Sequence, residues 1–146
     1  MASVVEDFLN AKEEEEVVEA IRQAELKTSG EIRVHLERKC EIDAFERAKE
    51  LFHFLKMDNT KAENGVLIYV AVDAKKFAIC GDRGINKVVP ENFWQSTKDL
   101  MQTEFKNRKF KDGLVKGINS AGQQLAKFFP WDADDVNELS DEISTS

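Results

Sequence analysis

The chain has 146 residues, of which 42% are hydrophobic and 34% are charged, a composition typical of one soluble globular domain. It carries 21 basic and 28 acidic residues, a net charge of −7, so it lacks the basic surplus needed to bind a nucleic-acid backbone or an anionic membrane surface. We therefore expect a monomer with no nucleic-acid partner and no membrane partner.

The amino terminus has no basic region followed by an apolar run, so it does not resemble a secretory leader. No apolar stretch approaches the roughly 18 residues that a membrane span needs. The two cysteines, Cys40 and Cys80, match no metal or redox motif, and we interpret them as reduced packing residues. Together these features predict a cytoplasmic protein.

The first predicted element is a helix from Ser3 to Lys27, which Gly30 follows as a turn residue. Residues Glu31 to Glu37 then alternate strictly between apolar and polar, which predicts a strand near a sheet edge. His35 lies on its polar face. It could be a catalytic base, but we interpret it as an ordinary polar-face residue.

Asp43 can cap a second helix, predicted from Ala44 to about Met57. A polar connection leads to Val66 to Val72, an unbroken apolar run that predicts a strand buried on both faces. A strand, helix and strand in this order form a crossover, so the two strands should be parallel.

A short polar break leads to a second strand of a hairpin, predicted from Lys76 to Cys80. The loop that follows, Gly81 to Gly84, carries an acid and a base between two glycines. Helices are predicted from Pro90 to Phe105 and from Asp112 to Phe129, and Pro130 ends the second of them. The whole order of elements predicts an α/β fold with a mixed sheet.

The domain is thus predicted over residues 3–130, with an acidic tail over residues 131–146. Six acids and no Lys or Arg follow Trp131. The tail is either disordered or a strap that folds back. We expect Trp131 to pack on the domain and the residues after Ile143 to be mobile.

Chain direction predicts where polar residues should gather. Parallel strands beginning at Glu31 and just after Asn64 start at the same sheet edge, and the hairpin returns Asp82 to that edge. Carboxylate, amide and carbonyl oxygens suit Ca²⁺ or Mg²⁺, which prefer hard ligands. The alternative is that Glu31 and Asp82 pair with nearby cations while Asn64 caps a turn.

A second oxygen-rich stretch, Asp132 to Asp135, begins like an EF-hand loop. Val136 occupies the next ligand position and no glycine follows at the turn, so it is not an autonomous EF-hand. Asp134 and Asp135 could still donate a carboxylate to the first cluster.

Several short motifs in a fixed order resemble the TPM domain family. They are SGEIRVHLE, a strand start NG followed by VLIYVAV, a D-x-K-K hairpin, GDRGIN, the pair Phe93-Trp94, and F-x-x-G at Phe110 to Gly113. The family is named for a thylakoid-lumen phosphatase, a photosystem II repair factor and a receptor modulator. The resemblance covers about residues 3–130 and matches a short bacterial form made of this domain alone.

The resemblance implies a three-layer α/β/α sandwich with a Rossmann-like sheet, divalent-ion binding in loops at one sheet edge, and an acid phosphatase activity claimed for plant members. Many members carry a secretion signal and a membrane segment, which this sequence does not show. Many also have GYGLEG where this chain has GDRGIN. The glutamate of that loop has no counterpart here, so only the loop position carries over, and Asp82 holds it.

Two functions follow. The first is a non-catalytic module that binds Ca²⁺, or more weakly Mg²⁺, and meets a protein partner. The second is a metal-assisted phosphatase, in which Arg83 would hold phosphate beside a loop-bound ion. No D-x-D-x-T/V, C-x₅-R or dinuclear histidine motif is present, so we favour the binding module.

Overall fold

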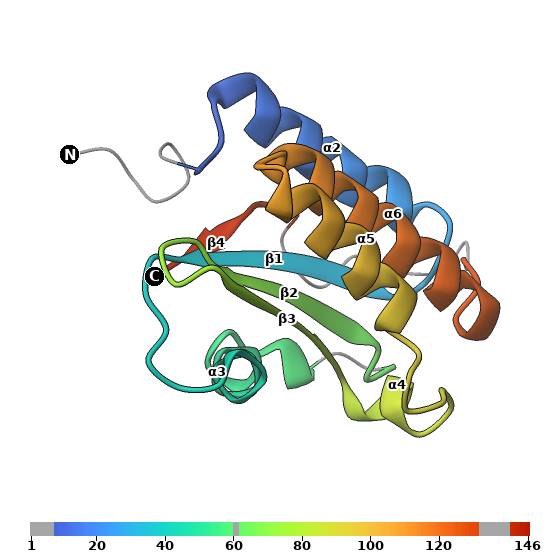
Figure 1. Ribbon diagram of the computed structural model, residues 1–146. Helices are drawn as coiled ribbons and strands as arrows, with labels where there is room; N and C mark the ends of the chain where they lie inside the picture. The colour runs from blue at the N-terminus through green and yellow to red at the C-terminus, as the bar shows by residue number, and fades with distance from the viewer. Residues whose placement is uncertain (1–7, 60–61, 132–140) are drawn as a thin grey trace.

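The computed structural model describes residues 8–59, 62–131 and 141–146. A four-stranded sheet in the order β3-β2-β1-β4 forms its middle layer. Helices α2, α5 and α6 cover one face of this sheet and α3 covers the other (Figure 1). The predicted α/β/α sandwich with a mixed sheet is therefore confirmed.

The first two strands match their predicted positions closely. β1 spans Glu31–Glu37, as expected, and β2 spans Gly65–Ala71. They pair in parallel with Glu31 opposite Gly65. The crossover helix α3 spans Ala44–Phe54, and Asp43 caps it by accepting from the backbone N–H groups of residues 45 and 46. A 3₁₀ turn, η1, follows at Met57–Asn59, so the predicted helix is a few residues too long.

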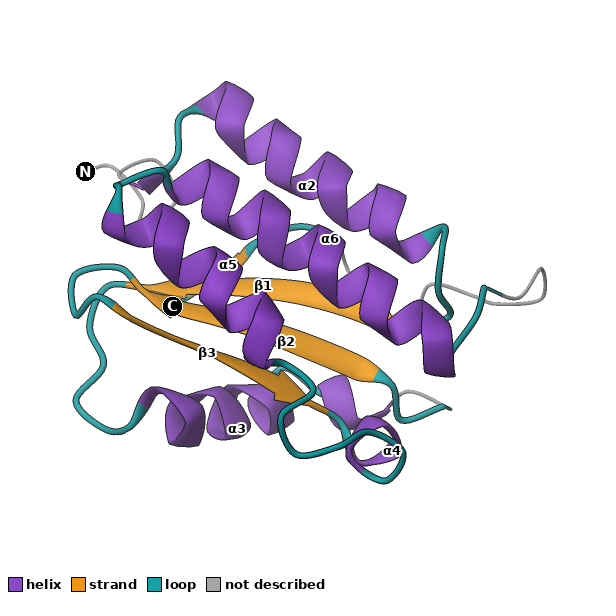
Figure 2. Ribbon diagram, turned by 45° about the vertical axis from the view of Figure 1, so that its right-hand side comes forward, coloured by secondary structure: helices purple, strands orange, loops and turns teal. Residues whose placement is uncertain are grey.

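β3 spans Lys76–Gly81 and pairs antiparallel with β2, which completes the predicted hairpin. The segment after it is not an open loop. Asp82 instead caps a one-turn helix, α4, at Arg83–Asn86. Figure 2 shows α4 at one end of β2 and β3, with the hairpin turn at the opposite end.

The remaining helices pack side by side on the sheet. α2 spans Ala11–Glu25, α5 spans Gln95–Lys106 and α6 spans Phe110–Phe128. The predicted helix is interrupted at residues 9 and 10, and α2 starts at Ala11 because Asn10 and Glu13 form a reciprocal capping box, which satisfies two backbone donors at that point. Residues 3–7 of the predicted helix lie outside the described residues. α5 starts later than predicted, because residues 91–94 form turns rather than helix.

Glycines allow α6 to lie close to its neighbours. A methyl group on Gly113 would collide with the Phe105 ring, and one on Gly117 would lie 2.6 Å from the Met101 sulfur. On Gly122 it would lie 2.9 Å from the Ala24 methyl. Burial of aliphatic residues on both sheet faces then forms the two cores, one under the three helices and one under α3.

The end of the chain differs from the sequence expectation. Ser144–Thr145 forms a short strand, β4, which pairs in parallel with β1 at His35 and Leu36. The residues after Ile143 are thus ordered by sheet pairing, and the expectation that they are mobile is wrong. Trp131 is 52% exposed, so its indole is only half covered by the domain. The rest of the predicted tail, residues 132–140, lies outside the described residues.

His35 is also not an ordinary surface residue. It is 1% exposed, and its two ring nitrogens lie 2.8 Å and 2.7 Å from the hydroxyls of Ser144 and Ser146. Burial lowers the pKa of His35 to about 4, so the imidazole is neutral at pH 7. The polar face of β1 is therefore a buried network, which the alternating pattern alone did not reveal. Cys40 and Cys80 are free and buried, as expected.

Candidate functional site

The sheet register places the predicted polar residues at one end of the sheet. Gly65 pairs with Glu31 on one side, and on the other its carbonyl accepts a hydrogen bond of 2.9 Å from the Asp82 N–H. Paired residues point to the same sheet face, so Glu31, Gly65 and Asp82 form one row facing the α3 layer. Strands lie about 4.8 Å apart, which puts the Glu31 and Asp82 backbones about 10 Å apart with no side chain between them.

Asp82 is the residue at this end of the sheet that carries an unsatisfied polar atom among the described residues. The residue is only 3% exposed, and its Oδ1 accepts a hydrogen bond of 2.7 Å from the Arg83 N–H. Within the part of the chain that is described, Oδ2 is buried and has no hydrogen-bond partner. Buried carboxylate oxygens are normally satisfied, so this oxygen has room for one further partner, either a hydrogen-bond donor or a cation.

The electrostatics around Asp82 oppose its negative charge. Burial is the main cause of a raised pKa, and the carboxylates of Glu63 and Asp58 raise it further. The Arg83 backbone hydrogen bond and charge lower it but do not compensate. A bound cation would relieve both the burial penalty and the repulsion between these three acids.

Backbone oxygens pack against α4, the helix that Asp82 caps. Gly84, in the first turn of α4, packs so tightly that a methyl group there would collide with the carbonyl oxygens of Ala62 and Glu63. Glu63 has a positive φ of 51°, and its carboxylate lies 2.9 Å from the Arg83 guanidinium. Asp58 lies 2.9 Å from His53 Nδ1. Carboxylates that act electrostatically on Asp82, and carbonyl oxygens packed on the next turn, are of the ligand type that a hard divalent cation prefers.

Asn64 ties the strand starts together. Its side-chain N–H donates to the Ser29 carbonyl at 3.1 Å, and its own carbonyl accepts from the Glu31 N–H at 3.3 Å. It is 2% exposed. These contacts explain why an amide occupies this position, and the role of Asn64 as a metal ligand stays a prediction.

Glu31 belongs to a second acidic group, on the far side of β1 from Asp82. Burial and a hydrogen bond to Asp141 raise the pKa of Glu25 to about 9, and the charge of Glu31 adds to this. Glu25 in turn accepts a hydrogen bond of 3.2 Å from the Ile32 N–H. These three acids line a cavity of about 270 Å³ beside Gly30.

Sequence reasoning missed Glu25, Asp141 and Asp58. Glu25 reads as the last turn of a helix, and Asp141 as one of many acids in a tail. The short turn between α2 and β1 brings Glu25 to Glu31, and the fold of the chain end back onto β1 brings Asp141 there. Asp58 follows the crossover helix in sequence, so its approach to Asp82 was not predictable from spacing.

Among the described residues, no acidic cluster joins Glu31 to Asp82. Over residues 8–59, 62–131 and 141–146, no three His, Cys, Asp or Glu side chains are grouped so that they could hold a metal ion. Glu31 and Asp82 stand on opposite sides of β2. Asp134 and Asp135 lie outside the described residues, so their contribution stays a prediction. Among the described helices, none is both long and apolar enough to cross a membrane.

A family model for the TPM domain matches residues 4–124. Among solved structures, the BA42 protein from the psychrophilic bacterium Bizionia argentinensis is similar over nearly its whole length. It shares 58% sequence identity, with a TM-score of 0.91 and coverage of 97% of this chain and 98% of that one.

Two more distant solved structures share the fold. The N-terminal domain of a protein from P. gingivalis has 20% identity and a TM-score of 0.67, with 84% of this chain and 79% of that one covered. The N-terminal domain of the cg2496 protein from Corynebacterium glutamicum has 8% identity and a TM-score of 0.64, with 92% and 79% covered. No curated protein matches the chain.

Proposed function

This chain belongs to the TPM domain family, and we propose that it is a divalent-cation-binding module that presents its occupied site to a protein partner in the cytoplasm. The observation that carries the proposal is Asp82 Oδ2, a buried carboxylate oxygen with no partner within the described ranges. In this proposal Asp82 is the first ligand, and the carbonyl oxygens of Ala62 and Glu63, which pack against Gly84 two residues further on, are the backbone candidates.

We propose Ca²⁺ as the preferred ion and Mg²⁺ as a weaker competitor. Ca²⁺ accepts six to eight oxygen ligands in irregular geometry, whereas Mg²⁺ needs near-octahedral geometry and holds its waters. The loop around Glu63 supplies ligands of mixed kind, carboxylate and carbonyl, which suits the larger ion. Asn64, Glu31, Asp134 and Asp135 are the further ligands that the sequence predicts.

Metal-assisted hydrolysis of phosphomonoesters is the alternative function. It needs a group that holds phosphate, and Arg83 is the cation beside the site. Its guanidinium already contacts the Glu63 carboxylate at 2.9 Å and its side chain is 74% exposed. A phosphate would have to compete with that carboxylate, so we favour cation binding without catalysis.

The test is thermal unfolding with and without Ca²⁺. Ligand at a hundredfold excess over its dissociation constant stabilises the folded state by roughly 2.7 kcal/mol, so wild type should melt at a higher temperature. Asp82→Asn should lose most of this shift, because it removes a charged ligand and keeps the shape and the cap. Asp73→Asn, at the opposite end of the hairpin, is the matched control and should keep the full shift.

Two further variants test the remaining predicted ligands. Glu31→Gln tests the second acidic group, and the double variant Asp134→Asn with Asp135→Asn tests the acidic stretch. Equal calcium-dependent shifts in wild type and Asp82→Asn would contradict the proposal. Calcium-dependent turnover of a generic phosphomonoester, lost in Asp82→Asn, would favour the phosphatase instead.

A further inference from the structure

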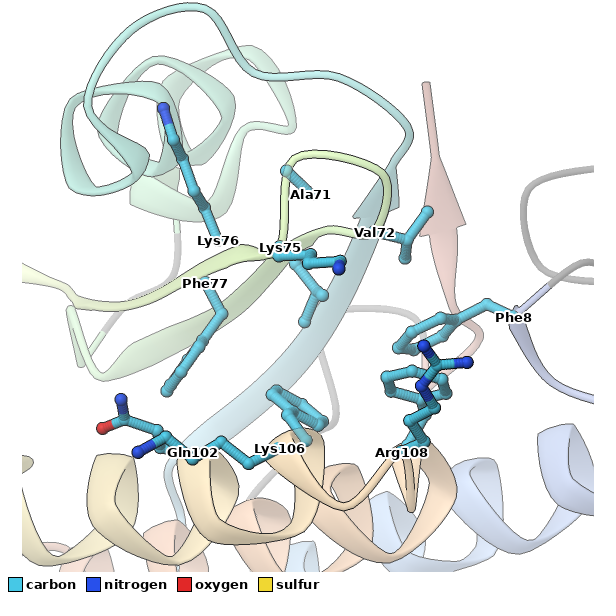
Figure 3. Close-up of a pocket in the computed structure, with 12 residues that line it drawn as sticks. Phe8, Ala71, Val72, Lys75, Lys76, Phe77, Gln102, Lys106 and Arg108 are labelled. Carbon is cyan, nitrogen blue, oxygen red and sulfur yellow. The ribbon is translucent and has the colours of Figure 1, made fainter.

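A second cavity lies at the hairpin end of the sheet, opposite to Asp82. It has a volume of about 650 Å³, within the range of roughly 300 to 1,000 Å³ typical of small-molecule sites. It opens between the β2–β3 turn and the α5–α6 turn (Figure 3). Its lining residues are Phe8, Val70, Ala71, Val72, Lys75, Lys76, Phe77, Gln102, Phe105, Lys106, Arg108 and Phe110.

The floor of this cavity is made of aromatic rings. The centroids of Phe8 and Phe110 are 4.6 Å apart, and those of Phe77 and Phe105 are 5.3 Å apart at nearly right angles. All four rings pack against the core and remain partly exposed. An apolar ligand that covered them would remove this surface from water, which is favourable.

The rim is basic. Lys75 comes from the hairpin, and Lys106 and Arg108 come from the end of α5 and the turn after it. In Figure 3 the side chains of Lys75 and Arg108 extend from opposite walls of the cavity. The fourth basic residue, Lys76, points to the other sheet face, where its ammonium lies 3.4 Å from the Cys40 carbonyl.

Among the residues that the structure describes, no acidic residue lines the cavity, although acids outnumber bases by seven in the whole chain. Lys75, Lys106 and Arg108 form no ion pair with any of the described residues. The three positive charges above an apolar floor are therefore available to an anion.

The backbone gives no reason for long basic side chains at two of these positions. Lys75 and Arg108 both have positive φ, 55° and 59°, where glycine is the favoured residue. Arg108 closes α5 in a Schellman motif, in which its N–H donates to the Phe105 carbonyl and the Lys109 N–H donates to the Glu104 carbonyl. Glycine would suit this motif better than arginine.

We propose that this cavity binds a small anionic amphiphile, a monocarboxylate with an unbranched hydrocarbon chain. The hydrocarbon lies on the rings of Phe8, Phe77, Phe105 and Phe110. The Arg108 guanidinium, whose planar fork matches a carboxylate, holds the acid group, and Lys75 and Lys106 add charge at the mouth. The negative group of such a ligand is complementary to the basic rim, and its apolar body is complementary to the aromatic floor. The site is independent of the cation site at Asp82.

The test uses sodium decanoate below its micelle concentration as the probe, with binding followed by backbone amide NMR shifts and calorimetry. We expect shifts at Val72, Phe77 and Phe110. Decanol lacks the charge and acetate lacks the chain, so each should bind at least tenfold more weakly, and decyltrimethylammonium should not bind. Equal binding of decanoate and decyltrimethylammonium, shifts elsewhere, or binding only to micelles, vesicles or acidic peptides would overturn the proposal.

Substitutions to glycine test the basic rim directly. Lys75→Gly and Arg108→Gly should each weaken decanoate binding several-fold, and together at least tenfold, without lowering the melting temperature. Lys56→Gly is the matched control, because Lys56 is also exposed, basic and at a positive φ of 59° but does not line the cavity. It should leave the affinity unchanged. Wild-type affinity in the double variant would overturn the proposal.

Discussion

Two buried carboxylates on the same sheet face have opposite surroundings. Glu37, at the hairpin end of β1, accepts hydrogen bonds from Arg47 at 2.7 and 3.1 Å, from the Ser146 hydroxyl at 2.7 Å, and from the Tyr69 hydroxyl. Asp82, at the other end, has one hydrogen bond and one oxygen without a partner in the described structure.

Their pKa values differ in direction for this reason. Burial raises the pKa of both groups, but at Glu37 the hydrogen bonds from Arg47, Tyr69 and Ser146 outweigh it and lower the pKa to about 2. At Asp82 burial and neighbouring acids win, and the pKa rises. Burial of an acid therefore does not by itself mark a binding site. A buried acid that the described residues leave incompletely satisfied is the better candidate for a ligand site.

The largest effect should come from removing the partner of Glu37, the carboxylate whose hydrogen bonds are complete. Arg47→Met removes both guanidinium hydrogen bonds and leaves the Glu37 charge without its cation, so it should lower the free energy of unfolding by about 3 kcal/mol. Arg83→Met, at the Asp82 end, removes only an exposed pair and should cost less than about 1 kcal/mol. Urea denaturation at pH 7 measures both. Equal losses would show that the two ends are not distinct.

An intermediate effect should come from replacing each carboxylate by its amide. Glu37→Gln should lower the free energy of unfolding by about 2 kcal/mol at pH 7, because one oxygen that accepts from Arg47 becomes an NH2 donor and the other loses its charge. Asp82→Asn should raise it by about 1 kcal/mol in metal-free protein, because a buried charge beside other acids is removed. If both variants lowered the free energy of unfolding, the proposed difference between Glu37 and Asp82 would be contradicted.

The pH dependence of these two differences should also have opposite signs. The folded-state pKa of Glu37 is depressed, so its stabilisation is present above about 4.5 and is lost as the pH falls toward 2. The folded-state pKa of Asp82 is raised, so the folded state prefers the protonated acid. The stability of the folded state therefore falls as the pH rises above 3.8 and Asp82 is forced to ionise. The benefit of Asp82→Asn should therefore grow with pH, and the cost of Glu37→Gln should vanish in acid.

The smallest effect should come from the chain end. Ser146→Ala removes the hydroxyl that donates to Glu37 and contacts His35, and should cost about 0.5 to 1 kcal/mol. Thr145→Ala, an exposed neighbour in β4, is the control and should change the free energy of unfolding by less than about 0.5 kcal/mol. Thermal unfolding at pH 7 compares them. No difference between the two would mean that Glu37 does not need its third donor.

The sequence by itself determined the elements whose signals are local. Strict alternation defined β1 at Glu31–Glu37, the Asp43 cap defined the start of α3, and the unbroken apolar run identified the central strand β2. The chain directions of a crossover and a hairpin were enough to place Glu31, Asn64 and Asp82 at one end of the sheet. These inferences succeed because side-chain periodicity and capping depend on neighbours a few residues away.

Only the tertiary structure decided which polar groups are satisfied. Glu37 meets Ser146 across a sequence separation of 109 residues, and Glu25 meets Asp141 because the chain end returns to β1. Nothing in the spacing of the acids distinguishes Glu37 from Asp82, since each is one carboxylate at the end of a strand. Their difference arises from long-range packing, which brings Arg47, Tyr69 and Ser146 to Glu37 and, among the described residues, brings no donor to Asp82 Oδ2. The basic rim above the aromatic cavity has the same origin, because the turns carrying Lys75 and Arg108 meet only in the folded chain.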